Sequence, residues 1–260
     1  MTEPVLELSA EFASEFEQKP DFDWFMALQG DVFRSAPGRR TLRFTVGDNY
    51  YFIKIHTGVG WKEIIKNLLQ GKLPIIGASN EYKAIKRLPQ LGVETMTLAA
   101  YGRQGWNPAT LRSFVVTEAL SNTVSLEELC QTWLDHPPSP AFKWKLIDSV
   151  AKIAKALHEN GVNHRDFYIC HFLLRQNSTD VHLYLIDLHR VQIRAKTPAR
   201  WILKDIAGLY FSSMAIGLTQ RDRLRFIRSY SNQPLKQTLG SQRSFWQQVR
   251  VKAEKLYARS

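Results

Sequence analysis

The chain has 260 residues but little cysteine, and its two cysteines lie far apart. Cys130 and Cys170 form no CxxC pair, so we predict neither a disulfide framework nor a cysteine-based zinc site, and a reducing compartment fits. The N-terminal segment lacks the basic and apolar regions of a secretory signal. No uncharged apolar run reaches the ~18 residues of a membrane-spanning helix. These absences predict a cytoplasmic protein, and the length allows one large core or two small lobes.

Basic residues are scarce at the start of the chain and acidic residues are scarce at its end. Residues 1–30 carry seven acidic side chains and one lysine, whereas residues 190–260 carry 15 Lys and Arg side chains and three acidic ones, within a net charge of +11. A basic surface attracts nucleic acid, anionic lipid headgroups or phosphorylated sugars, and it is equally typical of a solvated surface. Because no basic motif is interleaved with aromatic residues, we expect no nucleic-acid partner.

Alternation of apolar and polar residues predicts a β-rich N-terminal part. In residues 50–55, Phe52 and Lys54 share one face of a strand, and Tyr51, Ile53 and Ile55 share the other. Helical spacing of apolar residues predicts two helices in the same part, and Gly71 and Pro74 are expected to end the first. The expected elements are strands at 32–34, 39–46, 50–55, 96–101 and 113–117, and helices at 61–70 and 79–88.

The pattern changes to helix after Glu118. Helices are expected at 126–130, at 146–157 with Gly161 at the C-cap, and from about 204 to the end, with a strand at 183–186. The order predicts an α+β protein with the protein-kinase-like two-lobe fold. A β-rich N-lobe would cover 1–118, and a mainly helical C-lobe would cover 119–260.

The strongest motif is His164-Arg165-Asp166, which follows the long predicted helix. An apolar strand leads into Asp187, 21 residues after Asp166. Protein kinases place an HRD loop and a later DFG aspartate in this order. Phosphoryl transfer needs one carboxylate at the acceptor hydroxyl and another that holds Mg²⁺ against the phosphates of ATP. We therefore predict that Asp166 is catalytic and Asp187 is a metal ligand, with ATP and Mg²⁺ as cofactors.

Two positions depart from the kinase pattern. His171 stands five residues after Asp166, where kinases have asparagine. Because Mg²⁺ prefers oxygen ligands, three roles stay open for His171: metal ligand, contact to the nucleotide or Asp166, or packing. No GxGxxG loop precedes Lys54, so no phosphate-loop contact is assigned.

Asp205 resembles the kinase helix acid that binds the catalytic-loop backbone, and we expect a structural role for it.

Lys54 resembles the strand lysine of kinases, whose ammonium contacts the α- and β-phosphates. Its ion-pair partner should be a glutamate on a later helix. Glu81 is preferred because Ser79 can cap the start of its helix, and Glu63 is the rival. The predicted cofactor-binding residues are Lys54, Glu81, Glu118 and His171, with His171 also a candidate metal ligand.

The segment between Asp187 and Asp205 contains no Ala-Pro-Glu and is basic, which favours an anionic acceptor over an extended peptide. The apolar stripe within Trp61–Leu69 has three possible partners: a membrane interface, an acidic helical partner such as an acyl carrier protein, or its own lobe. The basic residues of the segment are Arg190, Arg194, Lys196, Arg200 and Lys204.

Two stretches are far more specific than the HRD tripeptide, namely Tyr168-Ile169-Cys170-His171-Phe172-Leu173-Leu174 and Ile186-Asp187-Leu188-His189-Arg190. With them the chain resembles the lipopolysaccharide core heptose(I) kinases of Gram-negative bacteria over nearly its full length. The histidine at position 171 is present in that family. Further matching stretches are 28–34, 39–44, 62–69, 163–166, 209–213 and 216–219.

The resemblance implies an enzyme that phosphorylates the first heptose of the lipopolysaccharide inner core with ATP. The enzyme would be peripheral to the cytoplasmic face of the inner membrane. Its acceptor would carry phosphates and Kdo carboxylates, and the resemblance gives Asp166 the role of base. Two alternatives stay open: a kinase for another acceptor (a Kdo sugar, a small molecule or protein tyrosine), or a catalytically dead kinase fold that serves as a binding module.

Overall fold

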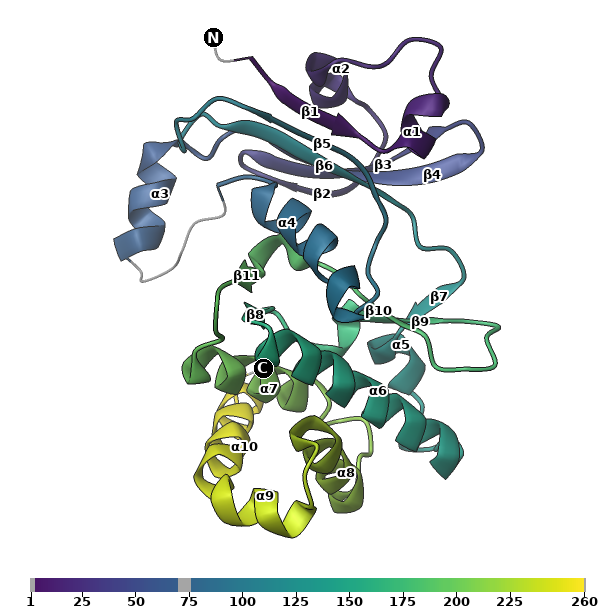
Figure 1. Ribbon diagram of the computed structural model, residues 1–260, viewed down its shortest axis with the longest axis vertical. Coiled ribbons are helices and arrows are strands. Elements are labelled where there is room, and N and C mark those ends of the chain that lie inside the picture. Colours follow the sequence, from purple (N-terminus) through teal and green to yellow (C-terminus); the bar gives the residue numbers. More distant parts are fainter. Residues whose placement is uncertain (1–2, 70–75, 260) are drawn as a thin grey trace. The chain divides into compact units, whose positions relative to one another are not determined.

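The computed structural model describes residues 3–69 and 76–259 (Figure 1). The predicted helix-ending residues Gly71 and Pro74 lie outside these ranges. The chain forms two compact units, with unit 1 inside Met1–Lys86 and Met96–Ser121 and unit 2 inside Arg87–Thr95 and Asn122–Ser260. Both helices and sheets are present, which confirms the α+β class.

Unit 1 is built on an antiparallel sheet of six strands with the order β1-β5-β6-β4-β3-β2. The hairpin from β3 to β4 pairs Val46 with Asn49 across a turn that contains Gly47, as the sequence predicts. The strands are β1 (Val5–Leu8), β2 (Asp31–Ala36), β3 (Arg39–Val46), β4 (Asn49–His56), β5 (Leu98–Gln104) and β6 (Arg112–Glu118).

Two short helices, α1 (Ala10–Ser14) and α2 (Phe22–Ala27), cover one face of this sheet (Figure 1). Phe12 and Phe25 are buried there against Ile53 of β4. The period of two along β4 therefore places Lys54 on the opposite face. There it meets α4 (Ser79–Arg87), while α3 (Gly60–Leu69) precedes α4 in the chain.

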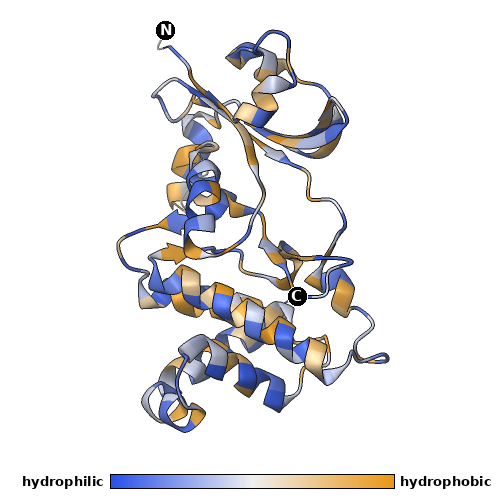
Figure 2. Cartoon of the chain, turned by 45° about the vertical axis from the view of Figure 1, so that its right-hand side comes forward, coloured by the Kyte–Doolittle hydropathy of each residue, from blue (hydrophilic) through white to orange (hydrophobic). Residues whose placement is uncertain are grey.

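Unit 2 is mainly helical, and its strands are short. The long helix α6 packs on α8, and α7 packs on α10. Figure 2 shows hydrophobic and hydrophilic residues alternating along α6, as expected for a helix that buries one face. The helices are α5 (Leu126–Cys130), α6 (Pro140–Glu159), α7 (Ala199–Ser212), α8 (Gln220–Ser231), α9 (Leu235–Ser241) and α10 (Arg243–Tyr257), with 3-10 turns η1 (Pro89–Leu91), η2 (Ile169–His171) and η3 (Leu188–Arg190).

Two small sheets carry the loops of unit 2 that hold the kinase-like motifs. β9 pairs with both β10 and β7, and β8 pairs with β11. Gly161 precedes β8 with φ +77°, and a Cβ there would lie 1.8 Å from the Arg194 carbonyl oxygen, so only glycine fits this close approach. The strands are β7 (Thr123–Ser125), β8 (Val162–Asn163), β9 (Phe172–Arg175), β10 (Leu183–Leu185) and β11 (Gln192–Ile193).

Several predicted boundaries were wrong by a few residues. α6 begins at Pro140 instead of about 146, because Ser139 caps it and proline is accepted at its first turn. Its cap residue is Asn160, and Gly161 follows in the left-handed conformation, which confirms the glycine predicted at the C-terminal end of this helix. The last helical region begins at Ala199 and not at 204. None of the helices within the described ranges combines the length and hydrophobicity needed to span a bilayer.

Candidate active site

The loop after β8 carries Asp166, and Asp205 of α7 holds its backbone. The two carboxylate oxygens of Asp205 accept the backbone N–H groups of His164 (2.6 Å) and Arg165 (2.8 Å). Arg165 has φ +75°, a conformation that is costly for a residue with a side chain. The two charge-assisted bonds offset that cost. This confirms the structural role predicted for Asp205.

His164 of the same loop is completely buried, and the centre of its ring lies 5.8 Å from that of His171. Its Nε2 donates to the carbonyl of Ile186, 3.0 Å away. Burial lowers the pKa of His164, so the ring is neutral at physiological pH. The hydrogen bond ties the loop of Asp166 to the residue that precedes Asp187.

Asp166 forms an ion pair that the sequence did not predict. Its Oδ1 accepts from Nη1 of Arg190 at 2.6 Å, and its side chain is only 14% exposed. Arg190 ends the short η3 turn, which folds it back toward the loop. A charge-assisted hydrogen bond of this kind fixes the orientation of the carboxylate. The sequence signal for Arg190 was its place three residues after Asp187.

Asp187 directly follows β10 and has φ +58°. His189 Nδ1 lies 2.6 Å from Asp187 Oδ1 and donates to it. The other oxygen, Oδ2, lies 3.6 Å from His171 Nε2. The buried Leu188 takes the phenylalanine position of the kinase DFG motif. One oxygen of Asp187 is thus held by a neighbouring histidine, while the other faces His171.

His171 links the two aspartates. Its Nδ1 lies 2.7 Å from the backbone carbonyl oxygen of Asp166. A carbonyl oxygen only accepts, so Nδ1 carries a proton, and Nε2 is the ring nitrogen that faces Asp187. An imidazole nitrogen and a carboxylate oxygen at this separation form a donor pair for a shared cation. Of the roles left open, the structure shows contact with Asp166, whereas metal binding stays a prediction.

The donor set at Asp187 and His171 fits a divalent cation that also binds nucleotide phosphates. Mg²⁺ in such sites takes one or two protein ligands and completes its shell with phosphate oxygens and water. Among the described residues, no group of three or more His, Cys, Asp or Glu side chains forms a metal site. A carboxylate and an imidazole suffice for a nucleotide-bound ion but not for a protein-only metal centre.

Unit 1 carries the predicted phosphate lysine. Lys54 Nζ lies 2.7 Å from Glu81 Oε1, and the Glu81 side chain is only 2% exposed. The rival Glu63 pairs instead with Lys66 at 3.3 Å. The predicted Lys54–Glu81 ion pair is therefore present. Glu118 ends β6 beside Tyr51 of β4, and its role in nucleotide binding stays a prediction.

The apolar stripe on α3 is mostly exposed. Ile64 alone of the stripe is buried, while Trp61, Ile65 and Leu68 are each more than half exposed and Leu69 is 84% exposed. The interpretation that this stripe packs on its own lobe was therefore wrong for all but Ile64. Exposed apolar rows of this kind are typical of interaction sites.

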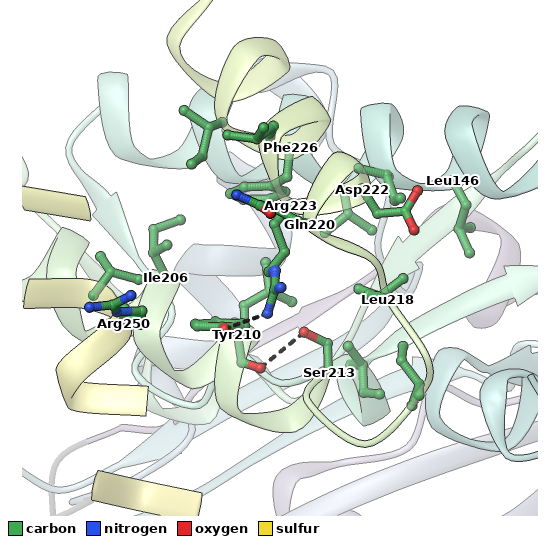
Figure 3. A pocket seen from close by; sticks show the side chains of 18 of the residues that line it. Leu146, Ile206, Tyr210, Ser213, Leu218, Gln220, Asp222, Arg223, Phe226 and Arg250 are labelled. Atoms are coloured by element: carbon green, nitrogen blue, oxygen red, sulfur yellow. Dashed lines mark hydrogen bonds between the residues drawn. The ribbon is translucent and has the colours of Figure 1, made fainter. Parts of the chain in front are cut away.

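Unit 2 also contains an apolar cavity of about 630 Å³ (Figure 3). At one side Arg223 reaches the hydroxyl of Tyr210 at 2.9 Å, and Ser213 donates to the Tyr210 carbonyl at 3.0 Å. No local pattern in the sequence predicts this cavity, because its walls come from five helices. Apolar residues of its lining include Trp133, Leu146, Ile206, Leu218, Phe226 and Trp246.

Comparisons with known proteins agree with this geometry. Residues 23–230 match the Lipopolysaccharide kinase (Kdo/WaaP) family. The chain belongs to this family. It is 49% identical to the lipopolysaccharide core heptose(I) kinase WaaP of Pseudomonas aeruginosa over 98% of this chain and 96% of the relative. It is 45% identical to the enzyme of that name from Escherichia coli, over 98% of both chains.

A solved structure of similar fold is described as WaaP in complex with acyl carrier protein. Its TM-score is 0.84 at 44% identity, over 97% of this chain and 99% of that one. The predicted protein-kinase-like fold and the resemblance to this kinase family are thus confirmed. The comparisons do not address individual residues, so the catalytic and binding roles stay predictions.

Proposed function

We propose that this chain transfers the γ-phosphate of ATP to a hydroxyl group of the first heptose of the lipopolysaccharide inner core. The observation that carries the proposal is the group formed by Asp166, His171 and Asp187, in a chain whose relatives at 45–49% identity are named heptose(I) kinases. Membership of a kinase family supports ATP as the phosphate donor.

The proposed base is Asp166. Its carboxylate would accept the proton of the attacking hydroxyl and orient that oxygen toward the phosphate. The charge-assisted hydrogen bond from Arg190 restrains the rotamer of Asp166. Lys54, held by Glu81, would contact the nucleotide phosphates, and Glu118 would contribute to nucleotide binding.

Asp187 Oδ2 and His171 Nε2 would hold the magnesium ion that accompanies ATP. When bound, this ion supplies charge neutralisation at the phosphates. His189 orients Asp187 through the 2.6 Å hydrogen bond, so the carboxylate presents one defined oxygen. Nitrogen is a weaker ligand than oxygen for Mg²⁺, and this donor pair therefore accepts Mn²⁺ as well.

We also propose that the protein binds an acyl carrier protein and works at the cytoplasmic face of the inner membrane, without spanning it. The related structure in complex with acyl carrier protein supports this partner. The exposed apolar stripe within Trp61–Leu69, with Lys62 and Lys66 on the same helix, suits an acidic partner helix. The apolar cavity of unit 2 suits the acyl chain that such a carrier bears.

The test is transfer of radiolabelled phosphate from ATP, with Mg²⁺, to dephosphorylated lipopolysaccharide core. Wild-type protein should label the heptose, and Asp166→Ala should lower kcat about 10²- to 10⁴-fold, as loss of a general base does. Asp180→Ala is the matched control, because Asp180 is an exposed carboxylate of unit 2.

Three other outcomes would contradict the proposal. Label on another acceptor would identify a kinase of different specificity. If the folded wild-type protein binds ATP but transfers no phosphate to the core, the chain does not have the proposed activity. Full complementation of a null strain by Asp166→Ala would favour the binding-module alternative.

A further inference from the structure

Trp201, in the first turn of α7, is surrounded by cations. The Lys204 ammonium lies 4.3 Å from the centre of its ring, and the guanidinium groups of Arg165 and Arg200 lie at 5.2 and 5.6 Å. A cation over an aromatic ring is favourable by about 0.5–2 kcal/mol. Three cations at one ring repel one another, however, so attraction to the ring does not explain the group. We call Arg165, Trp201 and Lys204 the Trp201 cluster.

These cations form no ion pair within the described part of the chain. Among the described residues, Arg165, Arg200 and Lys204 have no carboxylate within ion-pair distance, because the acids of this region have other partners. Asp166 pairs with Arg190, and Asp205 binds backbone N–H groups. Burial lowers the pKa of both Lys204 and Arg165, and the neighbouring cations lower each further. Arg165 is half-buried, whereas Arg200 and Lys204 are exposed, so the positive charge of the group is presented at the protein surface.

Two buried donors in the same place have no acceptor. Arg165 Nε and Trp201 Nε1 are both inaccessible to solvent and, within the part of the chain that the structure describes, make no hydrogen bond. Buried N–H groups nearly always have a hydrogen-bond acceptor, so a buried N–H group without one needs a physical explanation. Two N–H groups without an acceptor, on neighbouring residues whose guanidinium and ring lie 5.2 Å apart, are donors that a bound anion would satisfy.

The backbone adds to the positive potential. α7 begins after Pro198 without a side-chain cap and has no acidic residue in its first turn, whereas Arg200 lies there. Helix N-termini favour negative charge, so this sequence is unfavourable unless an anion is bound nearby. The left-handed conformation of Arg165, which Asp205 maintains, is what carries its side chain to Trp201.

We propose that the Trp201 cluster, flanked by Arg190 and Arg200, is a subsite for an oxyanion group, phosphate or carboxylate, carried by the acceptor. The inference rests on the proposed kinase function and specifies how that site selects its acceptor. Arg190 connects the Trp201 cluster with the candidate base. It contacts Asp166 directly, and its charge acts on both Arg165 and Lys204. An acceptor anchored there by its anionic group would present a neighbouring hydroxyl to Asp166.

The experiment compares Lys204→Gln and Trp201→Phe with wild type in the full-length chain. The matched control is Lys236→Gln, because Lys236 is an exposed lysine of unit 2 in α9. Steady-state transfer is measured with three acceptors: intact core, core without phosphate, and core with its carboxylates reduced. We expect Lys204→Gln to raise the acceptor KM about tenfold or more, as loss of a charge-assisted contact does, with kcat and the KM for ATP unchanged. Trp201→Phe, which keeps the ring but removes Nε1, should show a smaller increase.

The modified acceptors identify the group that binds. If the subsite binds a carboxylate, wild type and Lys204→Gln should have the same acceptor KM with carboxylate-reduced core. If it binds a phosphate, the two proteins should have the same acceptor KM with phosphate-free core. Inorganic phosphate should compete with the acceptor in wild type and lose this effect in Lys204→Gln. An equal increase for all three acceptors, an increase matched by Lys236→Gln, or an effect on the KM for ATP would overturn the inference. Absence of any transfer by wild type would instead refute the proposed function.

Discussion

At the scale of single residues, Asp205 controls the geometry on which the candidate base depends. Its two carboxylate oxygens accept hydrogen bonds from the backbone N–H groups of His164 and Arg165. Its carboxylate also faces Nε2 of His158 at 3.4 Å. Because one side chain serves three donors, no single neighbour can replace it.

We predict that Asp205→Ala lowers the free energy of unfolding by about 2–5 kcal/mol, because it leaves buried donors unpaired. Asp205→Asn keeps one acceptor oxygen and should fall between Asp205→Ala and wild type. Urea unfolding followed by circular dichroism measures this. Asp180→Ala, at an exposed carboxylate, should stay within about 0.5 kcal/mol of wild type. Asp205→Ala as stable as Asp180→Ala would show that the two backbone bonds contribute nothing.

The residue scale also separates what sequence spacing can and cannot predict. Lys54, Asp166 and Asp187 are found because their chemistry recurs at characteristic positions along the chain. The contacts of His189 and Arg190 could not be predicted, because they depend on a 3-10 turn of three residues after a left-handed residue. Such a turn has no periodic signature, and one change in its conformation would redirect both side chains.

At the scale of elements, α3 shows the limit of a hydrophobic period. The spacing of its apolar residues predicts the helix and its apolar face. It does not predict what covers that face, because an amphipathic pattern is the same for a core helix and a docking helix. The structure leaves Ile65, Leu68 and Leu69 exposed, so the described residues do not cover this face.

We predict that Leu68→Glu and Leu69→Glu weaken binding of an acyl carrier protein about tenfold or more, because each places an acid against an acidic partner. Isothermal titration calorimetry with purified carrier protein measures the Kd. Val5→Glu is the control, since Val5 is an equally exposed apolar residue on β1 of the same unit. Equal Kd values for all three variants would exclude the α3 stripe as the docking site.

The N-terminal elements were not predicted, although they complete the core of unit 1. β1 has four residues, α1 five and α2 six, which is too short for a periodic signal in an acid-rich segment. Their stability comes from tertiary contacts, in which Phe12 packs edge-on against Tyr51 and Phe25 stacks on Phe114. Long-range aromatic packing of this kind leaves no local pattern in the sequence.

At the scale of the whole molecule, the two units differ from the predicted lobes over Arg87–Thr95. This segment precedes β5 in the chain but packs with unit 2. Thr95 Oγ1 donates to the carbonyl of Leu185 at 2.6 Å, and Leu185 N–H donates to Glu94 at 2.9 Å. Partners 90 residues apart cannot be inferred from one sequence. The functional division at Glu118 stays a prediction.

The two units should also respond differently to acid. In unit 2, burial lowers the pKa of His164 below its ordinary value of 6.5. Below pH 6.5 the unfolded state therefore binds more protons than the folded state. As the pH is lowered from 6.5, the free energy of unfolding decreases until the pH is below the pKa of the folded state. In unit 1, the hydrogen bond from Tyr82 and the contact with Lys86 lower the pKa of Glu7 below 4.5. That contribution is complete above pH 4.5 and is lost only below it.

We therefore predict that unit 2 loosens first between pH 6.5 and 5, while unit 1 keeps its protection. Hydrogen–deuterium exchange with peptide resolution, corrected for the intrinsic pH dependence of exchange, measures each unit separately. His164→Phe removes the titrating ring and the bond to Ile186. We expect this variant to be less stable than wild type at pH 7.5. Between pH 6.5 and 5 it should lose less protection from exchange than wild type does. His136→Phe, at an exposed histidine of unit 2, should follow wild type. Parallel loss of protection in both units, or an unchanged slope in His164→Phe, would mean that another group governs acid stability.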